Sequence, residues 1–295
     1  MIKRWLVNLG LLVLIVGIVA FLYLRPQPED EGQDIYEVST LKLGDFTKVN
    51  IEFPAKAPVS FEKIDGYWHL TQPHKTRADQ LSVQRIISVV AATSSEKFST
   101  ENLEKFGLDQ PKLKVKLDNE EFLFGTYNPV SGEQYLAYKD AVYLVATSYS
   151  ESASIQVVEM IDKTPLKPTE KIAGFDLSRL EQWEDVRLNL DLVDGIWKAS
   201  TEKAKPVQDE VNEWVDSLWV NAAAKSVEPY IPNRSATYPS IQVKLQDGGK
   251  VHFDKMQESP EMLLGRPDEG LIYHFPPDAG FAMTNPPMHI PKEEE

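Results

Sequence analysis

The longest apolar stretch of the chain lies near its N-terminus, at residues 5–24. It has no charged side chain, and as an α-helix it would span about 30 Å, the thickness of the hydrocarbon core of a bilayer. Lys3 and Arg4 precede it, and a short basic N-terminal segment stays in the cytoplasm. The pattern predicts that residues 1–25 form a cytoplasmic tip and a single-pass anchor in a bacterial inner membrane, with the bulk of the chain in the periplasm.

Two other interpretations of this stretch stay open. A cleaved signal peptide would have a shorter apolar core and would end in small residues at the cleavage site, which Ala20-Phe21-Leu22 match poorly. A buried helix of a soluble protein is the other alternative. The polar residues 26–34 are predicted to form a linker, and residues 286–295 a disordered tail.

Beyond the linker, the same order of turn residues and apolar residues occurs twice, at a spacing of about 129 positions. The matching segments include Asp65-Gly66-Tyr67-Trp68 with Asp194-Gly195-Ile196-Trp197, residues 111–117 with 239–245, and residues 141–144 with 270–273. Several matches in one order at nearly one spacing indicate an internal duplication. We expect a first module over residues 35–162 and a diverged second module over residues 163–285.

Each module is predicted to begin with a β-hairpin. Asp-Gly favours a tight hairpin turn, because glycine tolerates positive φ and aspartate accepts hydrogen bonds in the turn. The segments before and after Asp65-Gly66 alternate between apolar and polar residues, as strands do when one face is buried. Trp68 and its counterpart Trp197, which follows Asp194-Gly195, are expected in the core.

A helix and a β-meander are predicted to follow each hairpin. Asp79 and Asp209 are expected to cap helices that run to about residues 94 and 224, and residues 101–106 to form a short helical turn closed by Gly107. The predicted meander strands cover residues 113–118, 121–126 and 142–145 in the first module, and 241–246, 250–254 and 271–275 in the second. The expected class is therefore α+β, with an N-terminal transmembrane helix ahead of two repeated modules.

Composition narrows the chemistry further. The formal net charge of the 295 residues is −14, and such an acidic surface repels phosphate backbones, so nucleic-acid binding is not expected. The chain has no cysteine, which excludes disulfides, thiolate metal sites and cysteine nucleophiles.

No catalytic, cofactor-binding or metal site is predicted. The chain lacks a glycine-rich phosphate loop, a His-Glu-x-x-His zinc motif and a Gly-x-Ser-x-Gly elbow. His69 and His74 flank a strand end, and a zinc site there would need a further ligand from elsewhere. The carboxylate pair at Glu120-Glu121 falls on a turn rather than on opposite sides of a cleft. We therefore expect a protein that is not an enzyme.

Tryptophans in the second module are candidates for a contact with a partner. Trp214 lies five residues before Trp219 on a predicted helix, so the two do not share a face. One of them could be exposed and mark a protein-binding surface, and burial of both against the neighbouring module is the alternative. We predict Trp214 and Trp183 as possible partner contacts.

An ordered set of short motifs resembles the DUF4340 family, bacterial proteins of uncharacterised function with an N-terminal membrane helix. The motifs are Trp68, Leu70-Thr71-Gln72-Pro73, Ala78-Asp79 and Phe106-Gly107-Leu108-Asp109-Gln110-Pro111. The resemblance is strongest over residues 40–150, and the second module lacks several of the motifs. The family has no catalytic residues to carry over, so the signature residues are structural: Asp65, Gly66, Trp68, Pro73, Gly107, Pro111, Asp194, Gly195 and Trp197.

The resemblance implies association with an ABC-type transport system. We expect a non-catalytic, membrane-anchored accessory or scaffold protein that faces the periplasm and contacts a transporter permease or another envelope protein. The alternative is a standalone cell-envelope protein that binds a glycan or a peptide in the groove between the modules. A hydrolase with an unrecognised site is a third interpretation. No cofactor is expected.

Overall fold

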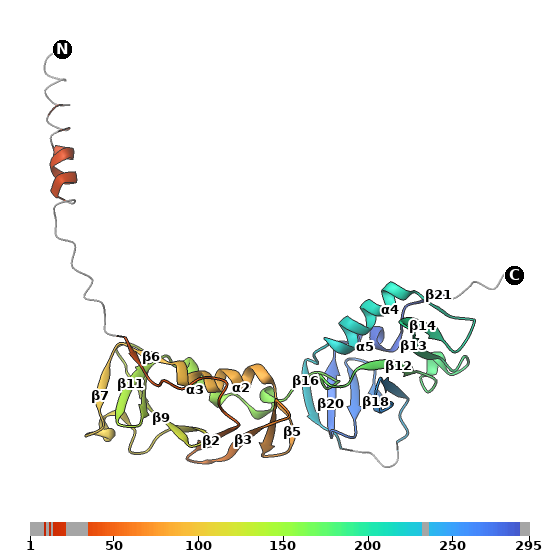
Figure 1. The fold of residues 1–295 in the computed structure, drawn as a ribbon, viewed down its shortest axis with the longest axis horizontal. Coiled ribbons are helices and arrows are strands. Elements are labelled where there is room, and N and C mark those ends of the chain that lie inside the picture. Colours follow the sequence, from red (N-terminus) through yellow and green to blue (C-terminus); the bar gives the residue numbers. More distant parts are fainter. Residues whose placement is uncertain (1–8, 10–11, 13, 22–34, 232–235, 290–295) are drawn as a thin grey trace.

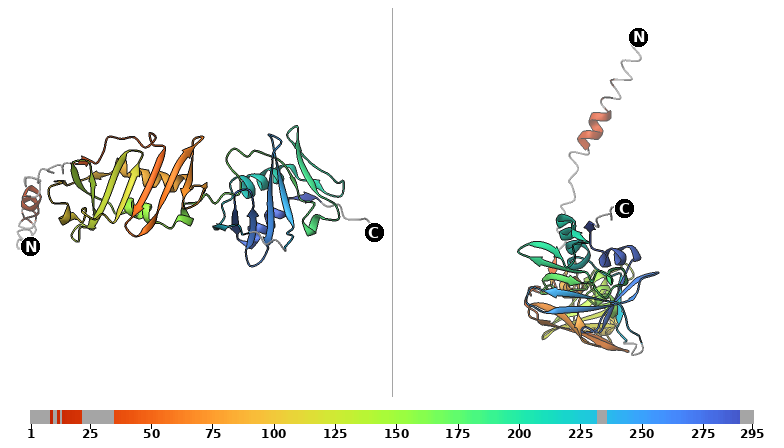
Figure 2. Two further views of the ribbon diagram at one scale, coloured as in Figure 1. Left: turned by 90° about the horizontal axis from the view of Figure 1, so that it is seen from below. Right: turned by 90° about the vertical axis from the view of Figure 1, so that its right-hand side faces the viewer.

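The computed structural model describes residues 9, 12, 14–21, 35–231 and 236–289. The described chain is built mainly of two large antiparallel β-sheets, which lie side by side along the long axis of the molecule (Figures 1 and 2). Helices cover one side of each sheet (Figure 1). We call residues 35–161 the first module, residues 172–289 the second module, and residues 162–171 the connecting segment.

The prediction of a transmembrane helix at residues 5–24 is wrong by this structure. In the part of the chain that is described, no helix combines the length and the apolar character needed to cross a bilayer. The prediction of a single-pass inner-membrane protein conflicts with the same finding. Of the predicted anchor, residues 9, 12 and 14–21 are described, and the predicted linker at residues 26–34 lies outside the described residues.

The predicted class also needs correction, because strands dominate the described chain and its helices are few and short. The sequence indicated α+β because residues 79–94 and 209–224 have the spacing of amphipathic helices. In the structure, regular α-helix covers only the first two turns of each of these segments. The fold is mostly β.

Within the described residues, nine strands form the sheet of the first module, in the order β5-β4-β3-β2-β8-β9-β10-β11-β7. They are β2 (Lys48–Phe53), β3 (Lys56–Ile64), β4 (Tyr67–Gln72), β5 (Thr76–Arg77), β7 (Lys97–Ser99), β8 (Leu113–Leu117), β9 (Glu120–Tyr127), β10 (Gln134–Tyr138) and β11 (Ala141–Val145). The short strands β1 (Tyr36–Glu37) and β6 (Thr93–Ser94) pair separately. The helical segments are α2 (Gln80–Ile87), η1 (Ser88–Ala91), η2 (Leu103–Phe106), α3 (Ser148–Ser154) and η3 (Val157–Met160).

The second sheet has the order β14-β13-β12-β17-β18-β19-β20-β16. Its strands are β12 (Ile172–Asp176), β13 (Asn189–Val193), β14 (Ile196–Ala199), β16 (Ser226–Pro229), β17 (Ser240–Leu245), β18 (Lys250–Gln257), β19 (Met262–Arg266) and β20 (Leu271–Phe275). The helical segments are η4 (Glu181–Trp183), α4 (Gln208–Val215), the π-helical η5 (Asp216–Val220) and α5 (Pro277–Thr284). β15 (Lys205–Pro206) pairs with β21 (Met288–His289).

The two sheets have corresponding strand orders. Taken in turn from β4 to β7, the strands of the first sheet match those of the second from β14 to β16. The Asp65-Gly66 turn joins β3 to β4 and the Asp194-Gly195 turn joins β13 to β14, with positive φ at all four residues. Both predicted hairpins are therefore confirmed. Each meander contains a further strand that the sequence did not predict, namely β10 and β19.

Only one of the two predicted helix caps is confirmed. The carboxylate of Asp79 accepts a hydrogen bond of 2.7 Å from the backbone N–H of Ser82 and so caps α2. Asp209 instead lies inside the first turn of α4, which begins at Gln208. The prediction of a disordered tail at residues 286–295 is also partly wrong, because β21 lies in it; residues 290–295 are outside the described chain.

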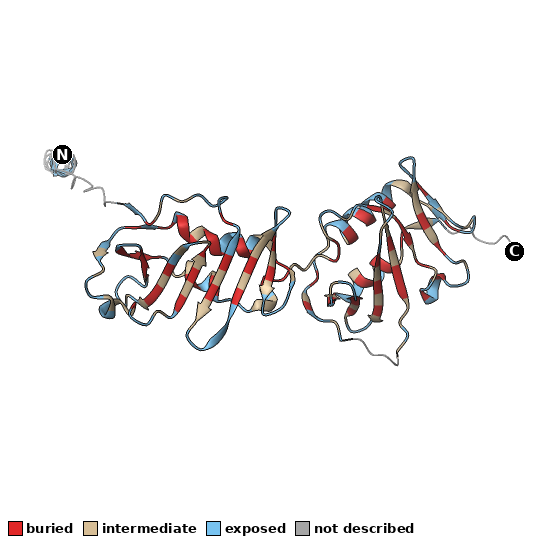
Figure 3. Ribbon diagram, turned by 60° about the horizontal axis from the view of Figure 1, so that its bottom comes forward, coloured by how far each residue is buried: buried red, intermediate tan, exposed pale blue. Residues whose placement is uncertain are grey.

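Buried and exposed residues alternate along the strands, so that one face of each sheet packs against the helices (Figure 3). In the second module this core is aromatic: the ring centroids of Phe175 lie 4.7 Å from Trp214 and 5.2 Å from Trp219. Ile161 and Leu166, at the junction of the modules, belong to the same connected cluster of buried side chains. The core therefore continues across the junction.

Candidate functional site

The tryptophans predicted as partner contacts are buried. Trp214 is 4% exposed and Trp183 is 9% exposed. The indole N–H of Trp214 donates to the backbone oxygen of Ala282 at 2.6 Å, and that of Trp183 donates to the backbone oxygen of Thr284 at 3.0 Å. Both side chains fix the α5 region to the second module, so neither presents a surface to a partner in this structure. The prediction from the five-residue spacing assumed a regular α-helix. It was wrong because the helix changes to π-helix at Asp216.

The signature residues occupy turns, strand ends and core positions. Trp68 and Trp197 are buried on equivalent strands. Gly107 ends η2 in the left-handed conformation, with φ of 64°, where a side chain would be strained. Pro73 follows β4 and Pro111 precedes β8. These placements account for the residues as parts of the fold and do not bring them together into one site.

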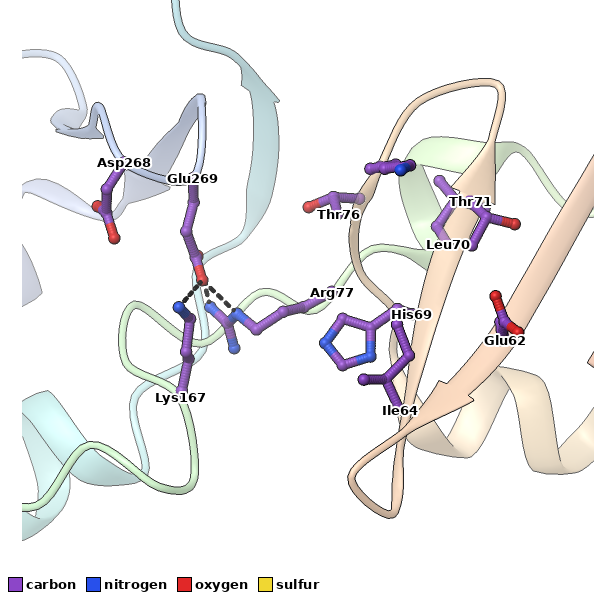
Figure 4. Close-up of a pocket in the computed structure, with 11 residues that line it drawn as sticks. Glu62, Ile64, His69, Leu70, Thr71, Thr76, Arg77, Lys167, Asp268 and Glu269 are labelled. Atoms are coloured by element: carbon purple, nitrogen blue, oxygen red, sulfur yellow. Dashed lines mark hydrogen bonds and ion pairs between the residues drawn. The ribbon is translucent and has the colours of Figure 1, made fainter. Parts of the chain in front are cut away.

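A groove lies between the modules. It consists of two adjoining cavities of about 370 and 220 Å³ that share Ile64, His69, Arg77 and Lys167 in their linings. One wall is the β3–β4 hairpin with β5, and the other is the β19–β20 turn with the connecting segment (Figure 4). A site built from both modules and the segment between them has the usual position of a ligand site in a protein of two domains.

The guanidinium of Arg77 fills the base of this groove. Its Nε and Nη2 donate to the two carboxylate oxygens of Glu269 at 2.9 and 3.1 Å, as Figure 4 shows. Nη2 also donates to the backbone oxygen of Thr164 at 2.6 Å and to the hydroxyl of Tyr273 at 3.0 Å, and Nη1 pairs with Asp162. One side chain from β5 thus contacts both the connecting segment and the second module.

Burial by itself lowers the pKa of Arg77, but the charges of Tyr273, Glu269 and Asp162 outweigh it and raise the pKa above its ordinary value. The neighbouring hydroxyl of Tyr273 has a raised pKa, first because it is buried and second because Glu269 is close. This hydroxyl donates to Glu269 at 2.9 Å. Arg77 therefore stays charged and Tyr273 stays neutral across the physiological pH range.

A second buried arginine holds the connecting segment to the β19–β20 turn. Arg266 is fully buried and donates to the carboxylate of Glu170 at 2.6 and 2.9 Å, to the backbone oxygen of Pro165 at 2.7 Å and to Asp268 at 3.0 Å. Its pKa is raised because hydrogen bonds to Glu170 and Asp268 outweigh the effect of burial. We call Arg77, Arg266 and their carboxylate partners the joint network.

A longer turn in the second module makes this network possible. In the first module, Lys139-Asp140 alone separates β10 from β11, whereas residues 267–270 separate β19 from β20. The strand registers pair Tyr138 with Ala141 and Arg266 with Leu271, so the repeat spacing changes from 128 to 130 across this turn. The two added residues are accommodated in the stretch that supplies Asp268 and Glu269. A change in repeat spacing was the signal in the sequence that could have located this site.

The lining of the groove also includes apolar and basic side chains. Ile64 and Tyr67, on either side of the Asp65-Gly66 turn, are 46% and 39% exposed. Lys167 reaches over the groove and lies 3.7 Å from Glu269. His69 is held by a contact of 3.0 Å between its Nδ1 and the backbone oxygen of Tyr67. This arrangement can bind and orient a ligand through apolar contact and donated hydrogen bonds.

Among the residues that the structure describes, no three histidine, aspartate or glutamate side chains are placed to share a metal ion. His69 and His74, the pair weighed in the sequence, are not brought together with a third such ligand. The carboxylates near the groove are instead turned toward arginines.

An equivalent hydrogen-bond device closes the edge of the hairpin strand in each module. The side-chain amide of Gln80 accepts from the backbone N–H of Trp68 at 2.9 Å and donates to its backbone oxygen at 3.0 Å. Gln208 makes the same two bonds to Trp197, at 2.8 and 2.9 Å. In the first module the amide adds to the pairing of β4 with β5, since Ala78 also donates to the oxygen of Trp68 at 3.1 Å. Gln208 is the first residue of α4, as Gln80 is of α2. Sequence reasoning missed both glutamines.

Comparison with known proteins identifies one family. The sequence pattern of DUF4340, described as a domain of unknown function, matches residues 68–239. The match runs from β4 across the connecting segment into the second module, rather than over residues 40–150 as expected. No curated protein and no solved structure matches the chain. Because the matched residues make up more than half of the sequence, the chain belongs to the DUF4340 family.

Proposed function

We propose that this DUF4340 protein is a non-catalytic binding protein that holds a segment of a partner protein in the groove between its modules. The observation that carries the proposal is the groove itself, whose walls come from both modules and whose rim exposes Ile64 and Tyr67. Exposed apolar side chains beside a hollow are typical of binding sites.

The joint network supports this proposal because it links the two walls of the groove. Arg77 connects β5 to Glu269 across the junction, and Arg266 connects the connecting segment to the turn that carries Glu269. A ligand that meets walls already in place loses less free energy to ordering the protein than one that must assemble them. A pre-arranged groove suits a protein that positions a partner.

The use of the carboxylates also favours binding over catalysis. A general base needs a carboxylate free to accept a proton. The pKa of Asp268 is lowered because its bond to Arg266 outweighs the effect of burial, and Glu269 accepts hydrogen bonds from both Arg77 and Tyr273. These groups hold the walls of the groove together. The resemblance of the chain to its family suggests a component of a transport system as the partner.

Site-specific photocrosslinking in cells tests this proposal, with a matched control inside the same chain. A photoreactive residue at Tyr67 lines the groove, whereas one at Ile196 occupies the equivalent side of the equivalent turn in the second module. We expect one protein to be trapped from position 67 and not from position 196. The proposal fails if position 67 traps nothing, or if both positions trap the same proteins.

A further inference from the structure

Of the five carboxylates that line the groove, Asp65 forms no ion pair with any described residue, and Asp162 pairs with Arg77. The other ion pairs are Glu62 with Lys48 at 3.3 Å, Asp268 with Arg266 at 3.0 Å, and Glu269 with Arg77 at 2.9 Å. An ionised carboxylate has about four acceptor sites, and each of these ion pairs occupies some of them. Part of the accepting capacity of the groove is therefore used by the chain itself.

The two lysines that line the groove have fewer close ion-pair partners than the arginines of the joint network. Lys75 lines the groove, is exposed, and forms no ion pair with any residue that the structure describes. Lys167, whose side chain is 42% exposed, lies 3.7 and 3.8 Å from Glu269 and Glu170, which the arginines already bind more closely. His69 lies beside the same hollow. The groove therefore offers Lys75 without an ion-pair partner among the described residues, and Lys167 with two partners that it shares with the arginines.

Apolar surface lies next to these donors. Ile64 contributes to both cavities, and Tyr67 and Pro168 contribute to the smaller one. A ligand that fits this lining places an apolar group on the hairpin rim and an anionic acceptor near the lysines. The net charge of −14 on the whole chain repels a long run of negative charge. Isolated acidic groups on an otherwise neutral segment fit better.

We infer that the groove recognises an extended peptide segment that carries acidic and apolar side chains close together, with a carboxylate received between Lys75 and Lys167 and an apolar side chain on Ile64 and Tyr67. This inference rests on the proposed function and specifies its ligand. Charge complementarity of this kind sets specificity and speeds association more than it adds affinity.

A peptide fits this lining better than a glycan. Ile64 and Tyr67 expose apolar surface beside the lysines, and a peptide can place an apolar side chain there, which sugar hydroxyls do not supply. Carboxylates on a peptide only accept when ionised, which matches what Lys75 and Lys167 offer.

A displayed library of short random peptides, selected on the full chain, tests the inference. The groove variants are Lys75→Glu with Lys167→Glu, and Ile64→Ser with Tyr67→Ser. Their matched controls in the second module are Lys198→Glu, at the position equivalent to His69, and Val193→Ser with Ile196→Ser, which flank the equivalent turn. Labelled acidic oligosaccharides are measured in parallel on the same proteins.

We expect the selected peptides to be enriched in Asp and Glu beside apolar residues. Their binding should weaken roughly tenfold in the double lysine variant and decline as ionic strength rises, with the Lys198→Glu control unchanged. Peptides that depend on Ile64 and Tyr67 but show no acidic enrichment would overturn the inference and leave the proposed function standing. If no peptide depends on the groove, or if only acidic oligosaccharides bind through the two lysines, both ideas are wrong.

Discussion

Arg77 makes contacts across the junction of the modules that the sequence around it does not indicate. It occupies a two-residue strand at the edge of the first sheet, yet it contacts Glu269, which lies 192 positions away. Desolvation of a buried ion pair offsets most of the attraction within it, so such a pair contributes little net free energy of folding. Removing one partner is different, because the other charge then stays buried without compensation.

Arg77→Ala should therefore lower the free energy of unfolding by about 3–5 kcal/mol, since Asp162 and Glu269 lose their shared cation. Arg77→Lys should lower the free energy of unfolding by less, because lysine keeps the positive charge and lacks only the planar set of N–H donors. Urea denaturation of the purified proteins measures both effects. The exposed Arg179→Ala is the control and should change stability by less than about 0.5 kcal/mol. Equal effects at positions 77 and 179 would contradict the role given to the joint network.

At the scale of elements, the sequence predicts features set by neighbouring residues, and it does not predict features that depend on side-chain contacts between separate elements. The Asp-Gly turns specify hairpins because they require positive φ, and the cap of α2 is a contact over three residues. β10 and β19 were missed because short apolar segments beside glycine and charged residues have no clear period. Gln208, the first residue of α4, instead bonds to a strand eleven residues earlier.

Gln80→Ala should destabilise the protein by about 1–3 kcal/mol, because the backbone N–H of Trp68 loses its partner at a half-buried sheet edge, while its oxygen keeps only the bond from Ala78. The matched control is Gln84→Ala, one turn later on the exposed side of α2, where little change is expected. Thermal unfolding followed by circular dichroism measures the difference. If the two alanine variants melt together, the amide of Gln80 does not stabilise the edge of β4.

At the scale of the whole molecule, the β19–β20 turn decides how the modules meet. The corresponding turn of the first module is shorter, and Tyr138 stands in register where the second module has Arg266. Because Gln80 bonds to the oxygen of Ala78 as Gln208 does to that of Pro206, the residue of the second module that corresponds to Arg77 is the exposed Lys205. The network is thus present at the junction and is not repeated within each module.

Deletion of Asp268 and Glu269 shortens the turn to the length found in the first module and removes acceptors from both arginines. The modules should then vary in their relative orientation. Spin labels on cysteines introduced at the exposed Lys105 and Lys203 report this as a broader distribution of distances, and the chain has no native cysteine to interfere. The double variant Asp268→Asn with Glu269→Gln, which keeps the length of the turn, should broaden the distribution less. An unchanged distribution after the deletion would show that the apolar contacts alone fix the junction.

The sequence by itself determined the features that depend on neighbouring residues or on a repeated spacing: the two Asp-Gly hairpins, the cap at Asp79, and the family signature that begins at Trp68. Only the tertiary structure decided which side chains meet across the junction. Arg77, Arg266 and Glu269 come from segments far apart in the chain, and a backbone pattern contains no record of such contacts because they arise from how two sheets pack. The burial of Trp183 and Trp214 was undetermined for the same reason.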